Sequence, residues 1–206
     1  MKSLLIKQAI VIPLAAMLVP ILLAFFLPGY SSISQHISEV ELLDNPIATI
    51  QRIAVIVTSV SIVLFGVGVF RVSSGRMGFT AVIAVITGLS FASNAVFIMS
   101  SPLHGLYGLG GFSLVLVPAF FAAEIQQLGG SRRIRQLSLL VTAVVMAYLW
   151  LMLARFDPAH FRGLTQRLFT VVYFGWFSLA CYWLSYHAVG VSVQRVTSFD
   201  ETAAAG

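Results

Sequence analysis

Charged residues are scarce in this chain of 206 residues, because Asp, Glu, Lys and Arg together make up only 9% of it. Soluble domains carry about 25% charged residues, so the composition excludes an ordinary soluble domain. A formal net charge of +5 raises the question of nucleic-acid binding, but the basic residues stand in short clusters between apolar runs. Such clusters cannot form a continuous basic groove, and we expect no nucleic-acid partner.

Cysteine is almost absent, since Cys181 is the single cysteine in the sequence. A disulfide within the chain and a cysteine metal cluster are therefore excluded. Ionisable residues are also missing from the middle of the long apolar runs, which argues against a proton-coupled pump or an ion channel. The glycines of "GLYGLGGF" do not form a dinucleotide-binding motif, and we expect no cofactor.

Long apolar runs make up most of the chain, which is 59% hydrophobic with a mean hydropathy of +0.96. A membrane-spanning helix needs about 20 mostly apolar residues, and runs of this length without alternation exclude a membrane barrel. The basic N-terminus resembles a signal peptide, but its apolar run is too long and no A-x-A-like site follows. The expected spans are residues 8–27, 48–70, 79–99, 106–125, 137–154 and 168–189.

These runs predict an all-α integral membrane bundle of six transmembrane helices. We expect one domain over residues 1–194, followed by a polar, disordered tail at residues 195–206. Asn45 and Pro46 offer a helix N-cap followed by proline at the first helical position, which predicts where the second helix begins.

Loop charges predict the orientation of the bundle, because an even number of spans puts both termini on one side. That side collects eight basic residues, namely Lys2, Lys7, Arg71, Arg76, Arg132, Arg133, Arg135 and Arg195. The opposite side collects four, namely Arg52, Arg155, Arg162 and Arg167. Since cytoplasmic loops carry an excess of Lys and Arg, we expect both termini in the cytoplasm.

Polar residues gather in three segments that this topology places on the outer side. The first segment carries His36, Ser38, Glu39, Glu41 and Asp44. The second carries Ser100, Ser101 and His104, and the third carries Arg155, Asp157, His160, Arg162, Gln166 and Arg167. Asn94, near the end of the third span, could point toward them. We expect these segments to form one polar surface.

The first outer segment also has an amphipathic pattern over Ser34–Leu43. In a short helix, His36 and Glu39 would lie three positions apart on one face. The other face would consist of Ile33, Ile37 and Val40. We therefore expect a short amphipathic helix that lies flat against the bundle or the headgroup layer.

Three roles are open for the outer polar surface. In a structural role, acids of the first segment pair with arginines of the third and fix the helix ends. In a binding role, Arg162 and Arg167 hold a phosphate or other anion, while His104 and Glu39 orient it. In a catalytic role, a histidine and a carboxylate activate Ser100 or Ser101.

A catalytic zinc site is a further form of the third role. His36, His104 and His160, with Glu39 or Asp157, would supply enough ligands for it. However, no HxxxH or HExxH spacing occurs in the sequence. We keep this histidine set as an alternative and expect no metal.

Three short fragments together resemble the DUF998 family, which comprises small six-helix membrane proteins of bacteria and archaea named as a domain of unknown function. The fragments are "HISE" after the first span, "SPLHG" before the fourth and "GLTQRL" at the start of the sixth. The resemblance implies a multi-pass protein of a prokaryotic inner membrane. It also marks a family signature at Ser38, Glu39, His104, Gln166 and Arg167. The sequence departs from the expected family pattern in "VELLDNP" and "MSSP".

From these observations we predict that an extracytoplasmic polar pocket binds a lipid headgroup or other amphiphile, with membrane lipids as partners. The predicted ligand-binding residues are Ser38, Glu39, Asn94, His104, Arg162, Gln166 and Arg167. The alternative function is a membrane-embedded hydrolase or acyl transferase that uses Glu39 and His104. A small-molecule transporter is the third possibility.

Overall fold

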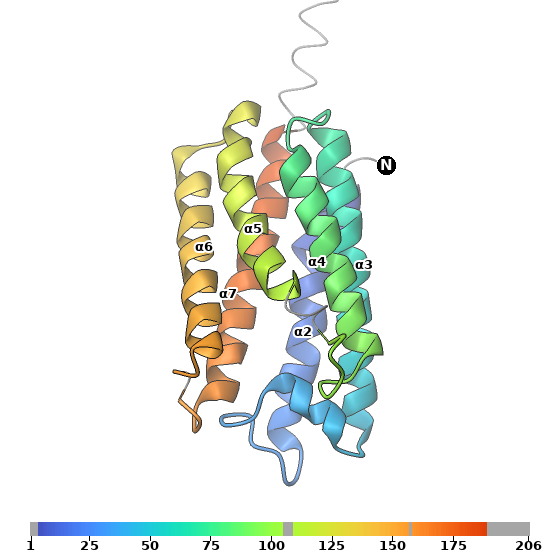
Figure 1. Ribbon diagram of the computed structural model, residues 1–206. Helices are drawn as coiled ribbons and strands as arrows, with labels where there is room; N and C mark the ends of the chain where they lie inside the picture. Colours follow the sequence, from blue (N-terminus) through green and yellow to red (C-terminus); the bar gives the residue numbers. More distant parts are fainter. Residues whose placement is uncertain (1–3, 105–108, 157, 189–206) are drawn as a thin grey trace, which may run out of the picture.

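The computed structural model describes residues 4–104, 109–156 and 158–188. Within this part the chain is all-helical and has no strand. Six of its helical segments are long and apolar enough to cross a membrane, so the prediction of a six-helix membrane bundle is confirmed (Figure 1). The spans are Leu4–Phe26, Pro46–Val72, Gly78–Val96, Leu109–Leu128, Arg132–Leu153 and Arg162–Tyr186.

The spans are built from the following elements. The first combines α1 (Leu4–Lys7), the 3-10 turn η1 (Gln8–Ile10), α2 (Ile12–Leu23) and η2 (Ala24–Phe26). The next three are α3 (Pro46–Val72), α4 (Gly78–Val96) and α5 (Leu109–Glu124), which continues into η4 (Ile125–Leu128). The last two are α6 (Arg132–Leu153) and α7 (Arg162–Trp183), which continues into the π-helical turn η5 (Leu184–Ala188).

The predicted start of the sixth span at residue 168 is wrong, because α7 begins at Arg162. Polar residues at 162–167 were interpreted as a loop, yet Gln166 and Arg167 occupy the second turn of the helix. Their side chains bind the chain between the first two spans, as described below, so the helix tolerates them. The fifth span likewise begins earlier than predicted, at Arg132.

The segment between the first two spans, residues 27–45, is called the first-loop segment below. It contains a 3-10 helix, η3 (Ile37–Leu42), and not the α-helix predicted over residues 34–43. Ile37 and Val40 are buried, as the amphipathic pattern indicated, but Ile33 is exposed. The Glu39 carboxylate accepts the His36 N–H at 3.0 Å and so closes the first turn of η3.

The predicted N-cap of the second span is confirmed. The Asn45 side-chain oxygen accepts the Ala48 N–H at 3.1 Å, and Pro46 is the first residue of α3. A different device starts α4, where the buried Glu124 carboxylate accepts the N–H groups of Phe79 and Thr80 at 3.1 and 2.9 Å. A carboxylate is favourable there because helix N-termini carry partial positive charge.

The spans form a ring in chain order, since each contacts the next and α7 returns to contact α2 (Figure 1). The antiparallel pair α3–α4 is packed closest, because glycines face the partner helix. A Cβ on Gly66 would lie 2.8 Å from the Ala81 carbonyl oxygen. A Cβ on Gly88 would lie 2.9 Å from the Ser59 carbonyl oxygen. Close backbone approach through small residues is typical of membrane helices.

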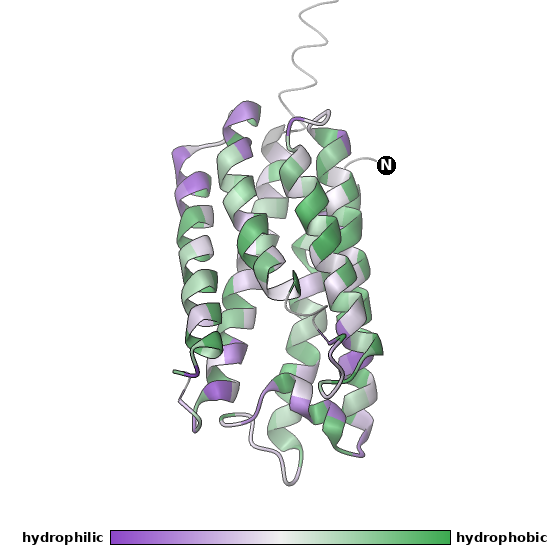
Figure 2. Cartoon of the chain, in the orientation of Figure 1, coloured by the Kyte–Doolittle hydropathy of each residue, from purple (hydrophilic) through white to green (hydrophobic). Residues whose placement is uncertain are grey.

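The two ends of the bundle differ. The first span begins and the last ends at the same end, where the Lys7 ammonium lies 5.4 Å from the Tyr186 ring centroid. This is called the terminal end. The opposite end carries the first-loop segment and residues 97–104 and 158–161, and is called the cavity end. Hydrophilic residues collect at both ends, and the surface between them is mostly apolar (Figure 2).

The interior of the ring is packed with aromatic side chains in the half nearer the terminal end. The rings of Phe65 and Phe177 lie 4.5 Å apart, and Phe121 meets Trp176 edge-on at 5.6 Å. The Trp176 indole N–H donates to Ser138 Oγ at 2.9 Å, so its polar atom is satisfied. The half nearer the cavity end is less completely filled and holds the candidate site.

Candidate functional site

Arg167 lies almost completely inside the protein, with only 4% of its surface exposed. Its guanidinium donates to the carbonyl oxygens of Gln35 at 3.1 Å and Gly163 at 2.9 Å. It also donates to the Tyr30 hydroxyl at 2.8 Å, which in turn donates to the His36 carbonyl oxygen at 2.8 Å. A buried charge needs such partners, and here two of the three, Tyr30 and the Gln35 carbonyl oxygen, come from the first-loop segment.

Tyr30 takes part in the contact between Arg167 and the first-loop segment in two ways, through its hydroxyl and through its ring. Burial raises the pKa of its hydroxyl, and the hydrogen bond and charge of Arg167 oppose that shift. The Arg167 guanidinium also lies 5.7 and 5.8 Å from the ring centroids of Tyr30 and Phe25, within the range of cation–π attraction.

Other residues near the start of α7 bind the same segment. Gln166 Oε1 accepts the Ile37 N–H at 2.6 Å. Arg162 Nε donates to the Ser34 carbonyl oxygen at 2.7 Å, and its guanidinium forms an ion pair with Glu39 at 3.2 Å. We call residues 162–167 of α7 the loop anchor, because they bind residues 30–39.

Gly163 lets these two parts of the chain approach closely. A Cβ on Gly163 would overlap the Gln35 carbonyl oxygen and lie 2.8 Å from that of Ser32. The sequence "GLTQR" therefore combines a small residue for contact with two side chains that bind backbone groups.

The loop anchor bears directly on the three roles considered for the outer surface. The pairing of Glu39 with Arg162 is the acid–arginine contact of the structural role. Arg167 donates from its two terminal nitrogens to carbonyl oxygens and a hydroxyl, while its Nε–H is buried without a partner in the described part of the chain. Neither arginine, nor Glu39, lines the cavity described next.

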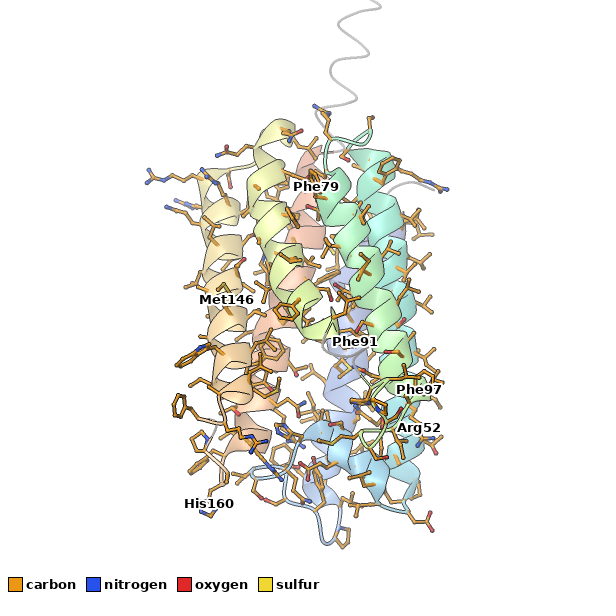
Figure 3. The ribbon with its side chains drawn as sticks, in the orientation of Figure 1. Arg52, Phe79, Phe91, Phe97, Met146 and His160 are labelled. Carbon is orange, nitrogen blue, oxygen red and sulfur yellow. The ribbon has the colours of Figure 1, made fainter. Side chains whose placement is uncertain are left out.

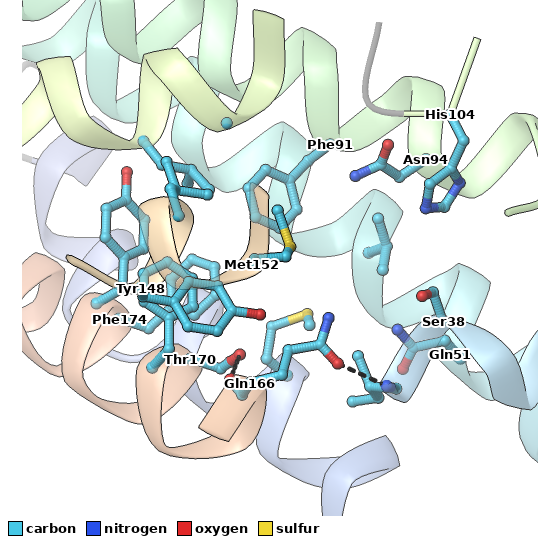
Figure 4. Close-up of a pocket in the computed structure, with 18 of the residues that line it drawn as sticks. Ser38, Gln51, Phe91, Asn94, His104, Tyr148, Met152, Gln166, Thr170 and Phe174 are labelled. Carbon is cyan, nitrogen blue, oxygen red and sulfur yellow. Dashed lines mark hydrogen bonds between the residues drawn. The ribbon is translucent and has the colours of Figure 1, made fainter. Parts of the chain in front are cut away.

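A cavity of about 230 Å³ lies inside the ring toward the cavity end (Figure 4). Four of the predicted ligand-binding residues line it: Ser38, Asn94, His104 and Gln166. Its other polar lining residues, which were not predicted to bind a ligand, are Glu41, Gln51, Tyr148, Thr170 and Tyr173. Its apolar rings are Phe91, Phe169 and Phe174. The cavity is therefore polar in part and aromatic in part.

Three polar atoms that belong to lining residues are buried and have no hydrogen-bond partner in the described part of the chain. They are Gln51 Oε1, the Tyr173 hydroxyl and Glu41 Oε2. Gln51 and Tyr173 are 3% and 1% exposed. Buried polar groups are nearly always hydrogen-bonded to protein or water, so these three indicate a place where something else supplies the partner.

Glu41 is the acidic residue of the cavity lining. Burial raises the pKa of its carboxyl to about 7, and the charge of Arg52 opposes that shift. Arg52 lies on α3 and, with Asp44, borders a second, more open pocket on the other side of Glu41. The Glu41 carboxyl therefore lies between the cavity and Arg52.

His104 is held in a defined orientation. Its Nδ1 lies 2.7 Å from the Phe97 carbonyl oxygen, and because a carbonyl only accepts, Nδ1 must carry the proton. In the neutral ring Nε2 is then an acceptor. Ser101 Oγ accepts the Leu103 N–H at 3.2 Å, and no serine side chain of the described ranges is bonded to the His104 ring.

The histidine set proposed as a metal alternative is not assembled. His160 is exposed at the cavity end and extends away from the bundle (Figure 3), whereas His104 lines the cavity. Within the described residues, no three His, Cys, Asp or Glu side chains lie close enough to hold a metal ion. Asp157, the other carboxylate considered, lies outside the described residues.

Sequence patterns carried only a weak signal for the missed residues. Gln51 stands near the start of an apolar run, and no sequence motif singles it out. Tyr173 lies within the predicted sixth span, and its hydroxyl is buried in the bundle. Glu41 was part of the polar segment, but its neighbour Glu39 was preferred. A polar residue well inside a span, as Tyr173 is, was the available clue.

Comparison with known proteins gives one family. A family model described as "Protein of unknown function (DUF998)" matches residues 10–183. The matched range includes the loop anchor and every residue that lines the cavity. No curated protein and no solved structure matches the chain.

Proposed function

The chain belongs to the DUF998 family of membrane-type six-helix proteins, and we propose that it binds the polar end of an amphiphile in the cavity inside the ring. The observation that carries this proposal is the set of unpartnered buried polar atoms on Glu41, Gln51 and Tyr173. Within a membrane bundle, a polar cavity needs a polar occupant, because unsatisfied groups are costly.

The mixed lining supports an amphiphile over a fully polar solute. Figure 4 shows Ser38, Gln51 and His104 on one side of the cavity, and the rings of Tyr148 and Phe174 on the other. A ligand with one polar end and one apolar end would satisfy both sides. Pockets for small molecules commonly combine a few polar groups with an apolar wall.

The size of the cavity limits how much of the ligand it encloses. A volume of about 230 Å³ equals that of roughly eight water molecules at about 30 Å³ each. This is room for a headgroup and the first atoms of a chain. The rest of the amphiphile would extend beyond the cavity, toward lipid or solvent.

The proposal includes an orientation. The side with both termini carries eight of the 12 Lys and Arg residues, so the positive-inside rule places the terminal end in the cytoplasm. The cavity would then open on the extracytoplasmic side of a prokaryotic inner membrane. Cysteine labelling of an exposed cavity-end residue such as Ser100 in intact cells tests this orientation.

Native mass spectrometry of the protein purified in a mild detergent tests the proposed binding. We expect a co-purifying amphiphile, and we expect Gln51→Leu to reduce its amount at least about fivefold, since a hydrogen bond of about 1 kcal/mol or more is lost. Thr58→Val is the matched control, because the Thr58 hydroxyl is also buried on α3, has no hydrogen-bond partner among the described residues, and does not line the cavity.

Two results would contradict the proposal. One is a purified protein that carries no amphiphile and takes up none when lipid is added. The other is equal loss of the amphiphile from the Gln51→Leu and Thr58→Val variants. Release of cleaved lipid products in the same spectra would instead favour the hydrolase alternative.

A further inference from the structure

The amphiphile proposed above can be specified by its charge. We infer that its polar end is a protonated amine, bound by the Glu41 carboxylate and the aromatic rings of the cavity. This inference rests on the proposed function and uses the same cavity.

The first argument is the sign of the charges in the cavity. Among the described residues that line it there is no Lys or Arg, whereas Glu41 is one of them. The two arginines nearest in sequence to the α7 lining residues are committed elsewhere. Arg162 binds Glu39 and the Ser34 carbonyl oxygen, and Arg167 binds carbonyl oxygens and Tyr30. A phosphate in the cavity would therefore meet no fixed cation, whereas an ammonium group would meet a carboxylate.

The second argument is the state of Glu41. Its Oε2 is buried and accepts no hydrogen bond within the described residues. Arg52 acts on it at a distance, but the ion pair found in the described part of the chain is that of Arg162 with Glu39. A buried carboxylate without a paired charge is costly. A cationic ligand supplies the missing charge and donor together.

The third argument is the kind of atom left unpartnered. Glu41 Oε2 and Gln51 Oε1 are both acceptors, so the ligand must present donors to them. A primary ammonium group has three N–H donors. A neutral polyol would also satisfy these acceptors, but it would leave the Glu41 charge uncompensated.

The fourth argument is the aromatic wall. Five rings line the cavity, namely Phe91, Tyr148, Phe169, Tyr173 and Phe174. Phe91 lies edge-on to Phe174 at 5.8 Å, and Tyr148 stacks on Phe169 at 4.3 Å. Ring faces attract cations within about 6 Å of their centroids, and aromatic walls are a common means of binding alkylated ammonium groups.

The inference also implies a pH dependence. The carboxyl of Glu41, with a pKa of about 7, becomes more ionised as pH rises through neutrality. An alkylamine stays protonated over this range, so its affinity increases in that direction. The ionisable groups around it are Arg52 on α3, Asp44 beyond η3, and His104, which lines the same cavity. Of these groups, Asp44 can be substituted without changing the cavity lining, because it does not line the cavity.

The test compares alkyl probes that differ only in the polar end: dodecylammonium, dodecyl sulfate and dodecanol. Binding to the full chain in a maltoside detergent is measured by displacement of co-purified amphiphile and by native mass spectrometry. We expect the ammonium probe to bind about tenfold more tightly than the other two, the effect of one charge-assisted contact. Glu41→Gln should weaken binding of the ammonium probe about tenfold and so remove this preference.

Asp44→Asn is the matched control, because Asp44 is an exposed acid of the same segment that does not line the cavity. It should retain the preference. If Glu41→Gln fails to fold, the unaltered protein still provides a test. Its ammonium-to-dodecanol affinity ratio should rise several-fold between about pH 6 and about pH 8, and Asp44→Asn should leave that rise in place.

The outcomes separate this inference from the proposed function. Equal binding of the three probes, or a preference for the sulfate, overturns the ammonium assignment and leaves amphiphile binding intact. A ratio that does not change with pH also overturns it. Failure of all three probes to bind or displace anything overturns both.

Discussion

Replacing Gly163 by alanine tests whether the loop anchor holds the first-loop segment in place. The added Cβ would overlap the Gln35 carbonyl oxygen and lie 2.8 Å from that of Ser32. Ordinary contacts of a Cβ begin at 3.4 Å, so the segment must retreat by more than half an ångström. Because these are backbone atoms, no side-chain rotation can relieve the overlap.

The expected cost combines strain and lost bonds. Overpacking costs about 1–3 kcal/mol. A retreat also lengthens the bond of 2.6 Å between the Ile37 N–H and Gln166, which is worth about 0.5–1.5 kcal/mol. We therefore expect Gly163→Ala to lower the free energy of unfolding by about 2–4 kcal/mol. For a chain of this size that corresponds to a fall in the melting midpoint of roughly 4–16 °C.

The assay has two readouts and a control on the same helix. Thermal unfolding in one detergent gives the midpoint, and hydrogen exchange of the Ile37 amide reports the contact itself. Gly175→Ala is the control, because a Cβ at Gly175 meets no atom within 4 Å. If both variants show the same midpoint and the same exchange at Ile37, the loop anchor does not hold the segment as described.

Three further predictions can be checked in the same preparations. Glu124→Ala removes the acceptor of two α4 N–H groups and of the Thr80 hydroxyl at 2.7 Å. It should lower the free energy of unfolding by about 2 kcal/mol or more in denaturation experiments. Glu124→Gln keeps one acceptor oxygen and should lower it less. The ligand-free protein should lose stability as pH rises from 4.5 to about 7, because the folded state holds the Glu41 proton more tightly than the unfolded state. The melting midpoint should therefore fall with rising pH across this range, and Glu41→Gln should reduce this dependence on pH. The ion pair of Arg162 with Glu39 should show a coupling energy below about 1 kcal/mol in a double-mutant cycle, since Arg162 is 42% exposed; a coupling of several kcal/mol would contradict this estimate.

The six spans were predictable because a membrane imposes one simple requirement, a long apolar run. The N-cap at Asn45 was predictable because its partner, Ala48, is local. The start of α7 was not, because Gln166 and Arg167 look like loop residues until their partners are known. Those partners are backbone groups of Ile37 and Gln35, and no sequence pattern records a contact with a distant backbone.

The candidate site was predictable only in part, for a related reason. Topology brought Ser38 and His104 to one end of the bundle, and both line the cavity. Topology alone does not determine whether Glu39 or Glu41 lines the cavity. Glu41 lines it, and which of the two side chains faces inward depends on the 3-10 geometry of η3. The inward direction of Gln51 depends on how α3 is rotated against its neighbours, which hydropathy does not specify.

The pairing of the loop anchor with the first-loop segment has a consequence for how the protein is made. Gln166 and Ile37 lie 129 positions apart, and Arg167 and Gln35 lie 132 apart. Ribosomes add about 5–20 residues each second, so the first-loop segment waits roughly 6–26 seconds for its partner to be synthesised. During that time the ring is open between α2 and the missing last helix. The cavity is therefore among the last features to form, and a chain that stops before α7 would carry five spans around an incomplete interior.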